Sequence, residues 1–197
     1  LHSFPTRRSS DLDDTTVAAV HIMPRTTTRV MVGPASSPDM DAKQVRDLIL
    51  TSGKKVVCGG TTSKIVAREL GQRIDVELKY YDEEVPPTAH IEGIDLVTEG
   101  ILTLSAAEKR MKEYLDEYED NVRKKEILDL DKKDGATKLV RLLVEECTDV
   151  VFMMGQANNP AHQNLDAPVS LNIKVRIVQN IATMLEKLGK HAEVEYY

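Results

Sequence analysis

Two adjacent carboxylates, Asp13 and Asp14, stand directly before an apolar β-type run. Hard divalent cations such as Mn²⁺ and Mg²⁺ prefer carboxylate oxygens, so an acidic pair at the start of a strand is a candidate pair of metal ligands. The same dipeptide is common in turns, because Asp caps backbone amides and tolerates turn geometry. A binuclear metal site would need further carboxylates from other parts of the protein.

The segment CGGTT, residues 58–62, lies between an apolar β-type run and a helical pattern. A glycine-rich turn that leads into a helix presents free backbone N–H groups and the positive end of the helix dipole to an anion. Gly59, Gly60, Thr61 and Thr62 are therefore candidate ligands of a phosphate. The segment matches neither the Walker A pattern nor the GxGxxG fingerprint, and a tight turn with Thr as the helix N-cap also accounts for every residue.

A second polar loop, over residues 158–164, follows another predicted strand. Its neutral hydrogen-bonding side chains are Asn158, Asn159, His162, Gln163 and Asn164. Ligands of open α/β sheets bind beyond the carboxyl ends of strands, so this loop suits recognition of a polar small molecule, with His162 able to titrate near neutral pH. A solvated turn built from Asn and Pro is the alternative. If the two loops share one edge of the sheet, together they outline a small-ligand site.

The other reactive side chains do not form a nucleophilic catalyst. Cys58 and Cys147 lie in apolar surroundings, and two isolated cysteines form neither a disulfide framework nor a zinc ligand set. This cysteine usage fits a reducing cytosol. His21 lies within the apolar run VAAVHIM, where a strand histidine with a satisfied hydrogen bond is favoured over a ligand. We find no Ser/His/Asp or Cys/His arrangement.

The elements that must position these groups alternate between strand and helix. Strands are predicted over residues 16–23, 29–32, 54–58, 74–81, 89–91, 94–97, 150–155 and 192–197. Helices are predicted around Val45 to Ile49, around Ile65 to Leu70, from Ser105 to about Lys125, and over residues 136–147 and 170–188. Strands that alternate with helices imply crossover connections. We therefore expect an α/β fold with a mostly parallel sheet and helices on both faces.

Several residues mark the ends of the predicted helices. Gly53, Gly71 and Gly189 each follow a helical pattern and are expected to stop it, because glycine adopts the left-handed conformation without a steric cost. Ser105 and Glu108 form a capping box that predicts the start of the long charged helix. The buried stripe predicted for that helix consists of Leu104, Ala107, Met111, Leu115, Tyr118 and Val122. Tyr114 and Tyr118 could also serve a homodimer contact.

The composition excludes two classes of partner. The chain has 26 basic and 32 acidic residues and a net charge of −6, which repels a phosphodiester backbone. No basic cluster with interleaved aromatic residues offsets this charge, so no nucleic acid partner is expected. No apolar stretch approaches the roughly 20 residues needed to cross a bilayer, so we expect no membrane partner and a cytoplasmic location.

The first twelve residues differ in kind from the rest. The run SFPTRRSSDL, residues 3–12, matches the translation of a common sequencing-library adapter residue by residue. We therefore expect residues 1–12 to be an artefactual leader and the natural sequence to start near Asp13.

Four segments together resemble a known family. DDTTVAAVHI, from Asp13, resembles the final catalytic strand motif of the PPM phosphatase superfamily. GKKVVCGGTTSKIVARELG, EGIDLVTEGILTL and NNPAHQN then resemble, in that order, the carboxy-terminal extension of bacterial SpoIIE-like phosphatases. The resemblance implies residues 13–28 as the last strand of a truncated PPM-type β-sandwich. It implies residues 29–197 as an α/β accessory domain.

The resemblance also implies a chemistry. In that family two Mn²⁺ or Mg²⁺ ions are held by carboxylates from several strands, and a bridging water attacks the phosphorus of phosphoserine or phosphothreonine. Asp13 matches the metal-ligand aspartate and Asp14 the neighbouring position, and the other ligands would lie upstream. DLVTEGI, residues 95–101, superficially resembles an Asp-Gly motif of the superfamily with Glu99 in place of Asp. That motif precedes the terminal strand in the family, so Glu99 is not expected to be a metal ligand.

The leading expectation is a metal-dependent protein serine/threonine phosphatase that acts on a phosphoprotein, with this extension as its regulatory or sensory domain and the fragment inactive by itself. Two alternatives remain open. The first is a module that binds a small anionic ligand, such as a phosphometabolite or a nucleotide, without catalysis. The second is a dimerisation domain.

Overall fold

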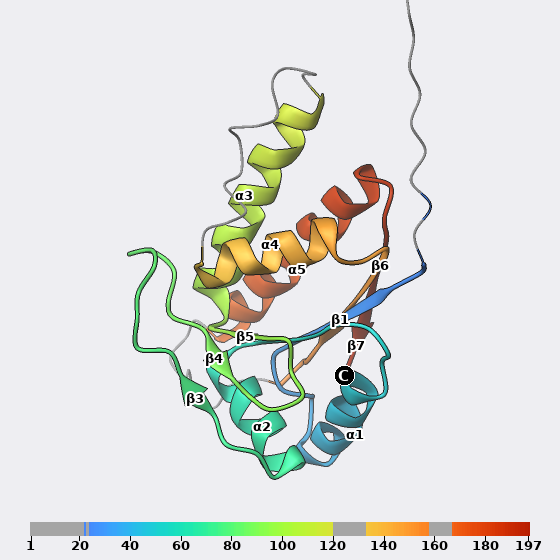
Figure 1. Cartoon of the computed structure of the whole chain (residues 1–197). Coiled ribbons are helices and arrows are strands. Elements are labelled where there is room, and N and C mark those ends of the chain that lie inside the picture. Colours follow the sequence, from blue (N-terminus) through green and yellow to red (C-terminus); the bar gives the residue numbers. More distant parts are fainter. Residues whose placement is uncertain (1–21, 23, 120–132, 158–166) are drawn as a thin grey trace, which may run out of the picture.

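The computed structural model describes residue 22 and residues 24–119, 133–157 and 167–197 (Figure 1). The acidic pair Asp13 and Asp14 and nearly all of the strand predicted over residues 16–23 lie outside these residues. The polar loop with Asn158, Asn159, His162 and Asn164 also lies outside them.

A seven-stranded sheet forms the centre of the described part, in the order β3-β4-β5-β2-β1-β6-β7. The parallel strands are β1 (Thr27–Val32), β2 (Lys55–Cys58), β5 (Leu96–Thr98), β6 (Asp149–Met154) and β7 (His191–Tyr196). The antiparallel strands are β3 (Asp75–Val76) and β4 (Ala89–His90), which lie beyond β5 at one edge. The mostly parallel α/β sheet predicted from the sequence is confirmed.

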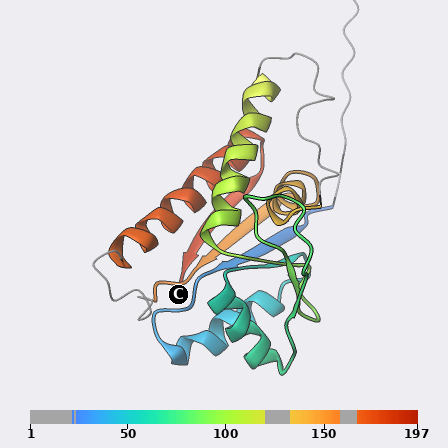
Figure 2. The ribbon, with the colours of Figure 1, turned by 90° about the vertical axis from the view of Figure 1, so that its left-hand side faces the viewer.

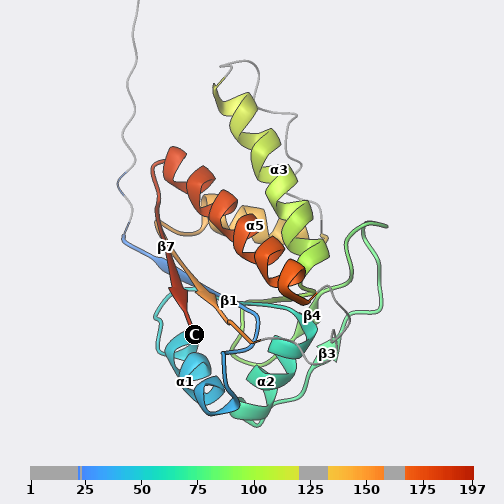
Figure 3. The same cartoon turned by 180° about the vertical axis from the view of Figure 1, so that it is seen from behind.

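Helices cover both faces of this sheet. The described helices are α1 (Pro38–Ile49), α2 (Gly60–Leu70), α3 (Ile101–Glu119), α4 (Gly135–Glu145) and α5 (Ala167–Lys187). Figures 2 and 3 show α1 and α2 on one face and α3, α4 and α5 on the other. None of the helices in the described ranges combines the length and the apolar character that a membrane crossing needs.

The central strands are buried because both of their faces carry apolar side chains. All six residues of β6, DVVFMM, are buried, which fits a continuous apolar run between two helical layers. Val30, Val150 and Phe152 face the core under α3, α4 and α5, whereas Met31 and Met153 face the core under α1 and α2. The sheet therefore separates two hydrophobic cores and fixes the carboxyl ends of its parallel strands at one edge.

Two of the predicted helix stops are confirmed. Gly71 follows α2 with a φ of 62°, and its N–H bonds back to the helix. Gly189 follows α5 with a φ of 78°, where Gly189 N and Lys190 N donate to Glu186 O and Leu185 O. The left-handed region favours glycine at both positions.

Other predicted boundaries are wrong. The capping box at Ser105 is an error, because α3 already begins at Ile101, directly after β5. Helix α1 ends at Ile49, not at Gly53. Only Asp75–Val76 of the strand predicted over residues 74–81 is a strand. Strand β1 begins at Thr27, two residues before the strand start predicted at residue 29.

Candidate functional site

A hollow of about 370 Å³ lies where the parallel strands end, and we call it the α2 hollow. Its lining comes from segments that follow β1, β2, β5 and β6 and from helix α5. These residues are Pro34, Gly59, Gly60, Thr61, Thr62, Ile65, Glu99, Gly100, Ile101, Ala157 and Lys174. Helices α2 and α3 both begin at the α2 hollow, so the positive ends of two helix dipoles meet there.

The turn at Gly59 leaves the first backbone amides of α2 without a side-chain cap. Gly59 is the N-cap residue with a φ of 122°, a conformation that favours glycine, and it makes no side-chain cap bond. Gly59 N donates to Thr98 O at 3.0 Å, which fixes the turn against the end of β5. Thr61 and Thr62 lie inside the first turn of the helix. The alternative in which a threonine is the N-cap is therefore wrong.

Thr62 places a buried hydroxyl beside the α2 hollow. Thr62 is 1% exposed and lines the α2 hollow. Within the described residues its Oγ1 makes no hydrogen bond, whereas the neighbouring Ser63 hydroxyl donates to Gly59 O at 2.8 Å. A Cβ on Gly59 would lie 2.9 Å from Thr62 Oγ1. The bare glycine thus leaves open the space beside this hydroxyl, and a buried hydroxyl is stable there only when something bonds it.

The charges around the α2 hollow favour an anion. Helix α2 has no acidic residue in its first turn, so its dipole is not offset locally. Lys174 of α5 lines the α2 hollow, and no described carboxylate lies within 4.0 Å of its Nζ. Glu99 is the acidic residue of the lining, and its Oε2 accepts a hydrogen bond from Leu102 N at 3.1 Å. Its charge is thereby directed at the start of α3.

The described side chains of the α2 hollow provide binding groups rather than a nucleophile. Cys58 ends β2 directly before the Gly59 turn, but it is 1% exposed. Burial raises the pKa of the Cys58 thiol to about 12, against a smaller opposing effect of a hydrogen bond with Thr98. A thiol with such a pKa stays protonated at neutral pH, and the thiolate is the reactive form.

The structure brings together four of the candidate residues that the sequence indicated. Gly59, Gly60, Thr61 and Thr62 line one hollow. Ala157, the residue before the polar loop of residues 158–164, lines the same hollow, so the two segments approach a shared sheet edge up to that point. The loop residues themselves lie outside the described ranges.

Sequence reasoning missed Lys174, Pro34 and Ile101. Lys174 lies within a predicted helix among other polar residues, and nothing in its spacing marks it as facing the α2 hollow. Glu99 caps the start of α3 by accepting a hydrogen bond from Leu102 N. Within the described ranges, no group of three or more His, Cys, Asp or Glu side chains is arranged to hold a metal ion.

Comparisons of the chain with protein-family models, with curated proteins and with solved structures found no match.

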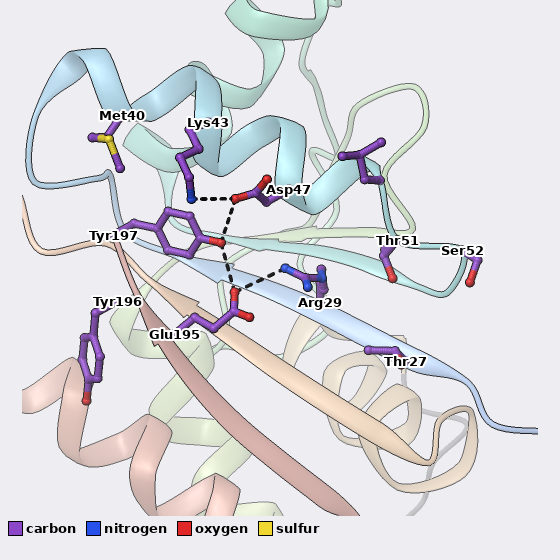
Figure 4. Close-up of a pocket in the computed structure, with 11 residues that line it drawn as sticks. Thr27, Arg29, Met40, Lys43, Asp47, Thr51, Ser52, Glu195, Tyr196 and Tyr197 are labelled. Atoms are coloured by element: carbon purple, nitrogen blue, oxygen red, sulfur yellow. Dashed lines mark hydrogen bonds and ion pairs between the residues drawn. The ribbon is translucent and has the colours of Figure 1, made fainter.

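A second and larger hollow of about 680 Å³ lies between α1 and the end of β7, and we call it the α1 trough (Figure 4). Its lining residues are Thr27, Arg29, Met40, Lys43, Asp47, Leu50, Thr51, Ser52, Glu195, Tyr196 and Tyr197. The sheet order places β6 and β7 beyond β1, and the described helices that pack on this face are α1 and α2. The α1 trough is therefore an uncovered part of the sheet face.

The charged groups of the α1 trough already bind one another (Figure 4). Lys43 Nζ lies 3.0 Å from Asp47 Oδ2, and Arg29 Nη1 lies 3.3 Å from Glu195 Oε2. The Tyr197 hydroxyl lies 3.1 Å from Asp47 Oδ2 and 3.0 Å from Glu195 Oε2. Burial and these two carboxylates raise the pKa of Tyr197. A ligand here would have to break paired contacts. The α2 hollow, whose donors have no partner in the described part of the chain, is therefore the stronger candidate site.

Proposed function

We propose that the described domain binds the phosphate group of a small metabolite or nucleotide in the α2 hollow. We further propose that it does so as the regulatory extension of a metal-dependent protein serine/threonine phosphatase. The observation that carries the binding proposal is a set of hydrogen-bond donors at the start of α2 that have no partner among the described residues. This set combines amides without a side-chain cap, the Thr62 hydroxyl and the ammonium group of Lys174.

A phosphate satisfies these donors together. Its oxygens accept hydrogen bonds from backbone N–H groups at a helix start, a geometry that also aligns the anion with the helix dipole. Lys174 would supply the opposite charge from the α5 side, and the Thr62 hydroxyl, which makes no hydrogen bond within the described ranges, would donate to a phosphate oxygen. A volume of about 370 Å³ lies within the range of pockets that hold small molecules. The rest of the ligand would extend toward Pro34 and Ala157.

Binding can be tested with inorganic phosphate and with a panel of sugar phosphates and nucleoside monophosphates. In the full chain, we expect a bound phosphate to shift the NMR amide signals of Gly60, Thr61 and Thr62 before other signals move. Lys174→Gln removes a charge-assisted contact of about 1.5–3 kcal/mol and should weaken binding about tenfold or more. Lys64→Gln, a change of the same charge at an exposed position of α2 outside the lining, should leave binding unchanged.

The binding proposal fails if no probe in the panel shifts these amides. It also fails if Lys174→Gln and Lys64→Gln weaken binding equally, because binding would then depend on overall charge rather than on the α2 hollow. Thr62→Val is a second check, since it keeps the shape and removes the hydroxyl. It should weaken phosphate binding about three- to tenfold, in line with one neutral hydrogen bond.

The phosphatase proposal is supported by the motif at Asp13 and Asp14 and by the resemblance of the later segments to the extension of SpoIIE-like phosphatases. Asp13 and Asp14 would be metal ligands together with carboxylates from sequence upstream of residue 13. The described domain would then supply ligand sensing, which fits a lining of binding groups. Bound Mn²⁺ or Mg²⁺ would activate the water that hydrolyses the phosphoprotein.

Catalysis can be tested on the chain joined to its native upstream coding region. We expect Mn²⁺-dependent hydrolysis of a phosphoserine peptide, with at least a hundredfold loss in Asp13→Asn, because a binuclear site loses a ligand. The probe that binds the α2 hollow should change this rate, and Lys174→Gln should raise the probe concentration needed for that change about tenfold or more. A rate that Asp13→Asn leaves unaltered would refute the phosphatase assignment without bearing on phosphate binding.

A further inference from the structure

Strand β3 is an edge strand of the sheet, at the end opposite to β7, and one of its sides is not paired with another described strand (Figure 1). Strand β3 pairs with β4 in antiparallel register, with Asp75 opposite His90 and Val76 opposite Ala89. Glu77 N donates to Thr88 O at 2.9 Å, which extends this pairing by one residue. Because hydrogen-bonded and non-bonded pairs alternate, the backbone groups of Val76 point away from β4, toward the free edge.

Alternate residues along this edge expose large apolar side chains. Val76 is 60% exposed, Leu78 is 90% exposed and Tyr80 is 65% exposed, and we call these three residues the β3 edge strip. A spacing of two residues puts them on one side of an extended chain. Natural sheet edges usually carry charges or proline against unwanted pairing, so an edge with three exposed apolar side chains indicates a contact surface.

The β3 edge strip stays exposed because Glu77 and Tyr81, whose side chains lie on the other side of the chain, are held by contacts there. The Glu77 carboxylate accepts a hydrogen bond from the Thr88 hydroxyl at 2.9 Å and lies 3.8 Å from Lys138 Nζ. Lys138 also lies 5.9 Å from the centre of the Tyr81 ring. Glu77 and Tyr81 thus face α4, which leaves the β3 edge strip on the opposite side of the chain.

We propose that the occupant of this edge is a second copy of the chain, joined by antiparallel pairing of the two 75–81 segments about a two-fold axis at Leu78. In this register Leu78 lies opposite the second copy's Leu78, and Val76 lies opposite its Tyr80. Glu77 then lies opposite the second copy's Lys79, so opposite charges meet on each side of the axis. Directly opposed pairs of these kinds stabilise antiparallel strands.

Charge selects this register over its neighbours. An axis at Glu77 would oppose two Glu77 carboxylates, and an axis at Lys79 would oppose two Lys79 ammonium groups. Both arrangements keep the backbone groups of even-numbered residues facing each other, but like charges directly opposite destabilise a sheet. Among these three registers, only the axis at Leu78 combines apolar pairs and complementary charges without opposing like charges. The resulting dimer is independent of ligand binding in the α2 hollow.

The dimer can be tested by sedimentation of the full chain and by cross-linking. Leu78→Lys opposes two ammonium groups at the axis and should raise the dissociation constant at least about tenfold. Leu50→Lys is the matched control, because Leu50 is 75% exposed at the end of α1, remote from β3, and it should dimerise like the wild type. With a short bifunctional maleimide, Leu78→Cys should give covalent dimers and Leu50→Cys should not, since Cys58 and Cys147 are buried.

Three outcomes overturn the proposal. One is a wild-type chain that sediments as a monomer at every concentration up to that of a concentrated stock. Another is a dimer that persists unchanged in Leu78→Lys, which would place the interface elsewhere. The third is equal cross-linking of Leu78→Cys and Leu50→Cys, which would indicate random collisions. Circular dichroism of Leu78→Lys separates loss of the dimer from loss of the fold.

Discussion

Asp134 is the buried carboxylate whose removal tests most sharply how the helical layer over the sheet is held. Its side chain is 2% exposed and is the N-cap of α4. Oδ1 accepts hydrogen bonds from Ala136 N at 3.0 Å and Thr137 N at 3.1 Å, and Oδ2 accepts one from the Thr137 hydroxyl at 2.9 Å. Arg110 of α3 binds the same carboxylate and also reaches Asp82 Oδ2 at 2.8 Å. One side chain therefore joins α3, α4 and the segment after β3.

The size of the effect follows from these contacts. Asp134→Ala removes the N-cap, which costs about 1 kcal/mol, and takes from Arg110 a charge-assisted bond of about 1.5–3 kcal/mol. We expect a loss of about 3–4 kcal/mol in the free energy of unfolding, because Arg110 keeps Asp82 as a partner. Asp134→Asn can still cap the helix and loses mainly the charge, so about 2 kcal/mol is expected. The difference between the variants separates the cap from the ion pair.

The pH dependence gives a second, independent measure. Burial alone would raise the pKa of Asp134, but Arg110 and the bonds from Thr137 outweigh it and hold the pKa below its usual range. A lowered pKa in the folded state contributes stability above the unfolded pKa, near 4, which is lost as the pH falls through the folded pKa. The gap between wild type and Asp134→Asn should thus be full at pH 7 and shrink below about pH 4.

Urea denaturation followed by circular dichroism at pH 7, 5 and 3.5 measures these free energies. Asp39→Asn is the matched control, because Asp39 is exposed in the first turn of α1 and should change stability by less than about 0.5 kcal/mol. The reasoning is refuted if Asp134→Asn is as stable as Asp39→Asn at pH 7. A gap that stays constant down to pH 3.5 would also refute it, because the ion pair would then not be its source.

Two further predictions concern stability. Gly155→Ala should lower the free energy of unfolding by about 3 kcal/mol or more, because the added Cβ would lie 1.9 Å from Pro34 O, a backbone atom. Gly60→Ala, which meets nothing within 4 Å, should change it by less than about 1 kcal/mol, and similar melting temperatures for the two variants would contradict this reasoning. Tyr197→Phe should cost only about 1 kcal/mol in a urea titration, because Asp47 and Glu195 keep their cationic partners; a loss above about 3 kcal/mol would show that the hydroxyl organises the α1 trough.

The architecture could be predicted where the signal is local and strong. Strand β6 is a run of mostly apolar residues. Gly71 and Gly189 end their helices at a positive φ, which a residue with a Cβ adopts only at a steric cost. The start of α3 could not be predicted in this way. Ser105 and Glu108 satisfy a local capping pattern, but Glu99 caps the helix one turn earlier, and tertiary packing at the end of β5 decides between them.

The sequence predicted the glycine-rich turn of the α2 hollow but not the side chain of Lys174 that lies opposite it. Glycine and threonine after a strand mark a turn that can hold an anion, and Gly59 to Thr62 do line the α2 hollow. Lys174 lies more than 100 residues later on α5, so its place opposite α2 depends on the topology of the whole sheet. The shortness of β3 has a similar origin. Residues 77–81 alternate like a strand, but β4 offers only a short partner, and Glu77 and Tyr81 bind Lys138 instead.

The position of the α2 hollow also follows from how the chain closes the centre of its sheet. The strand order reverses at β1, with β2 and β5 on one side and β6 and β7 on the other, and such a reversal usually opens a crevice for a ligand. Here the loops after β1 and β6 bond to each other, with Gly155 N donating to Val32 O at 2.9 Å and Ala157 N to Pro34 O at 3.2 Å. The absence of a side chain on Gly155 permits this contact.

Because the loops after β1 and β6 close the crevice between these two strands, the open space lies beside the turn after β2 instead. Pro34 and Ala157 become one wall of the α2 hollow instead of the mouth of a central cleft, and the other wall is the start of α2. An anion must then be held by the turn after the second strand rather than by the turn after the first. This arrangement explains why the glycines and the buried Thr62 hydroxyl occur after β2, whereas the turn after β1 carries Pro34 and leads into a helix with Asp39 and Asp41 in its first turn.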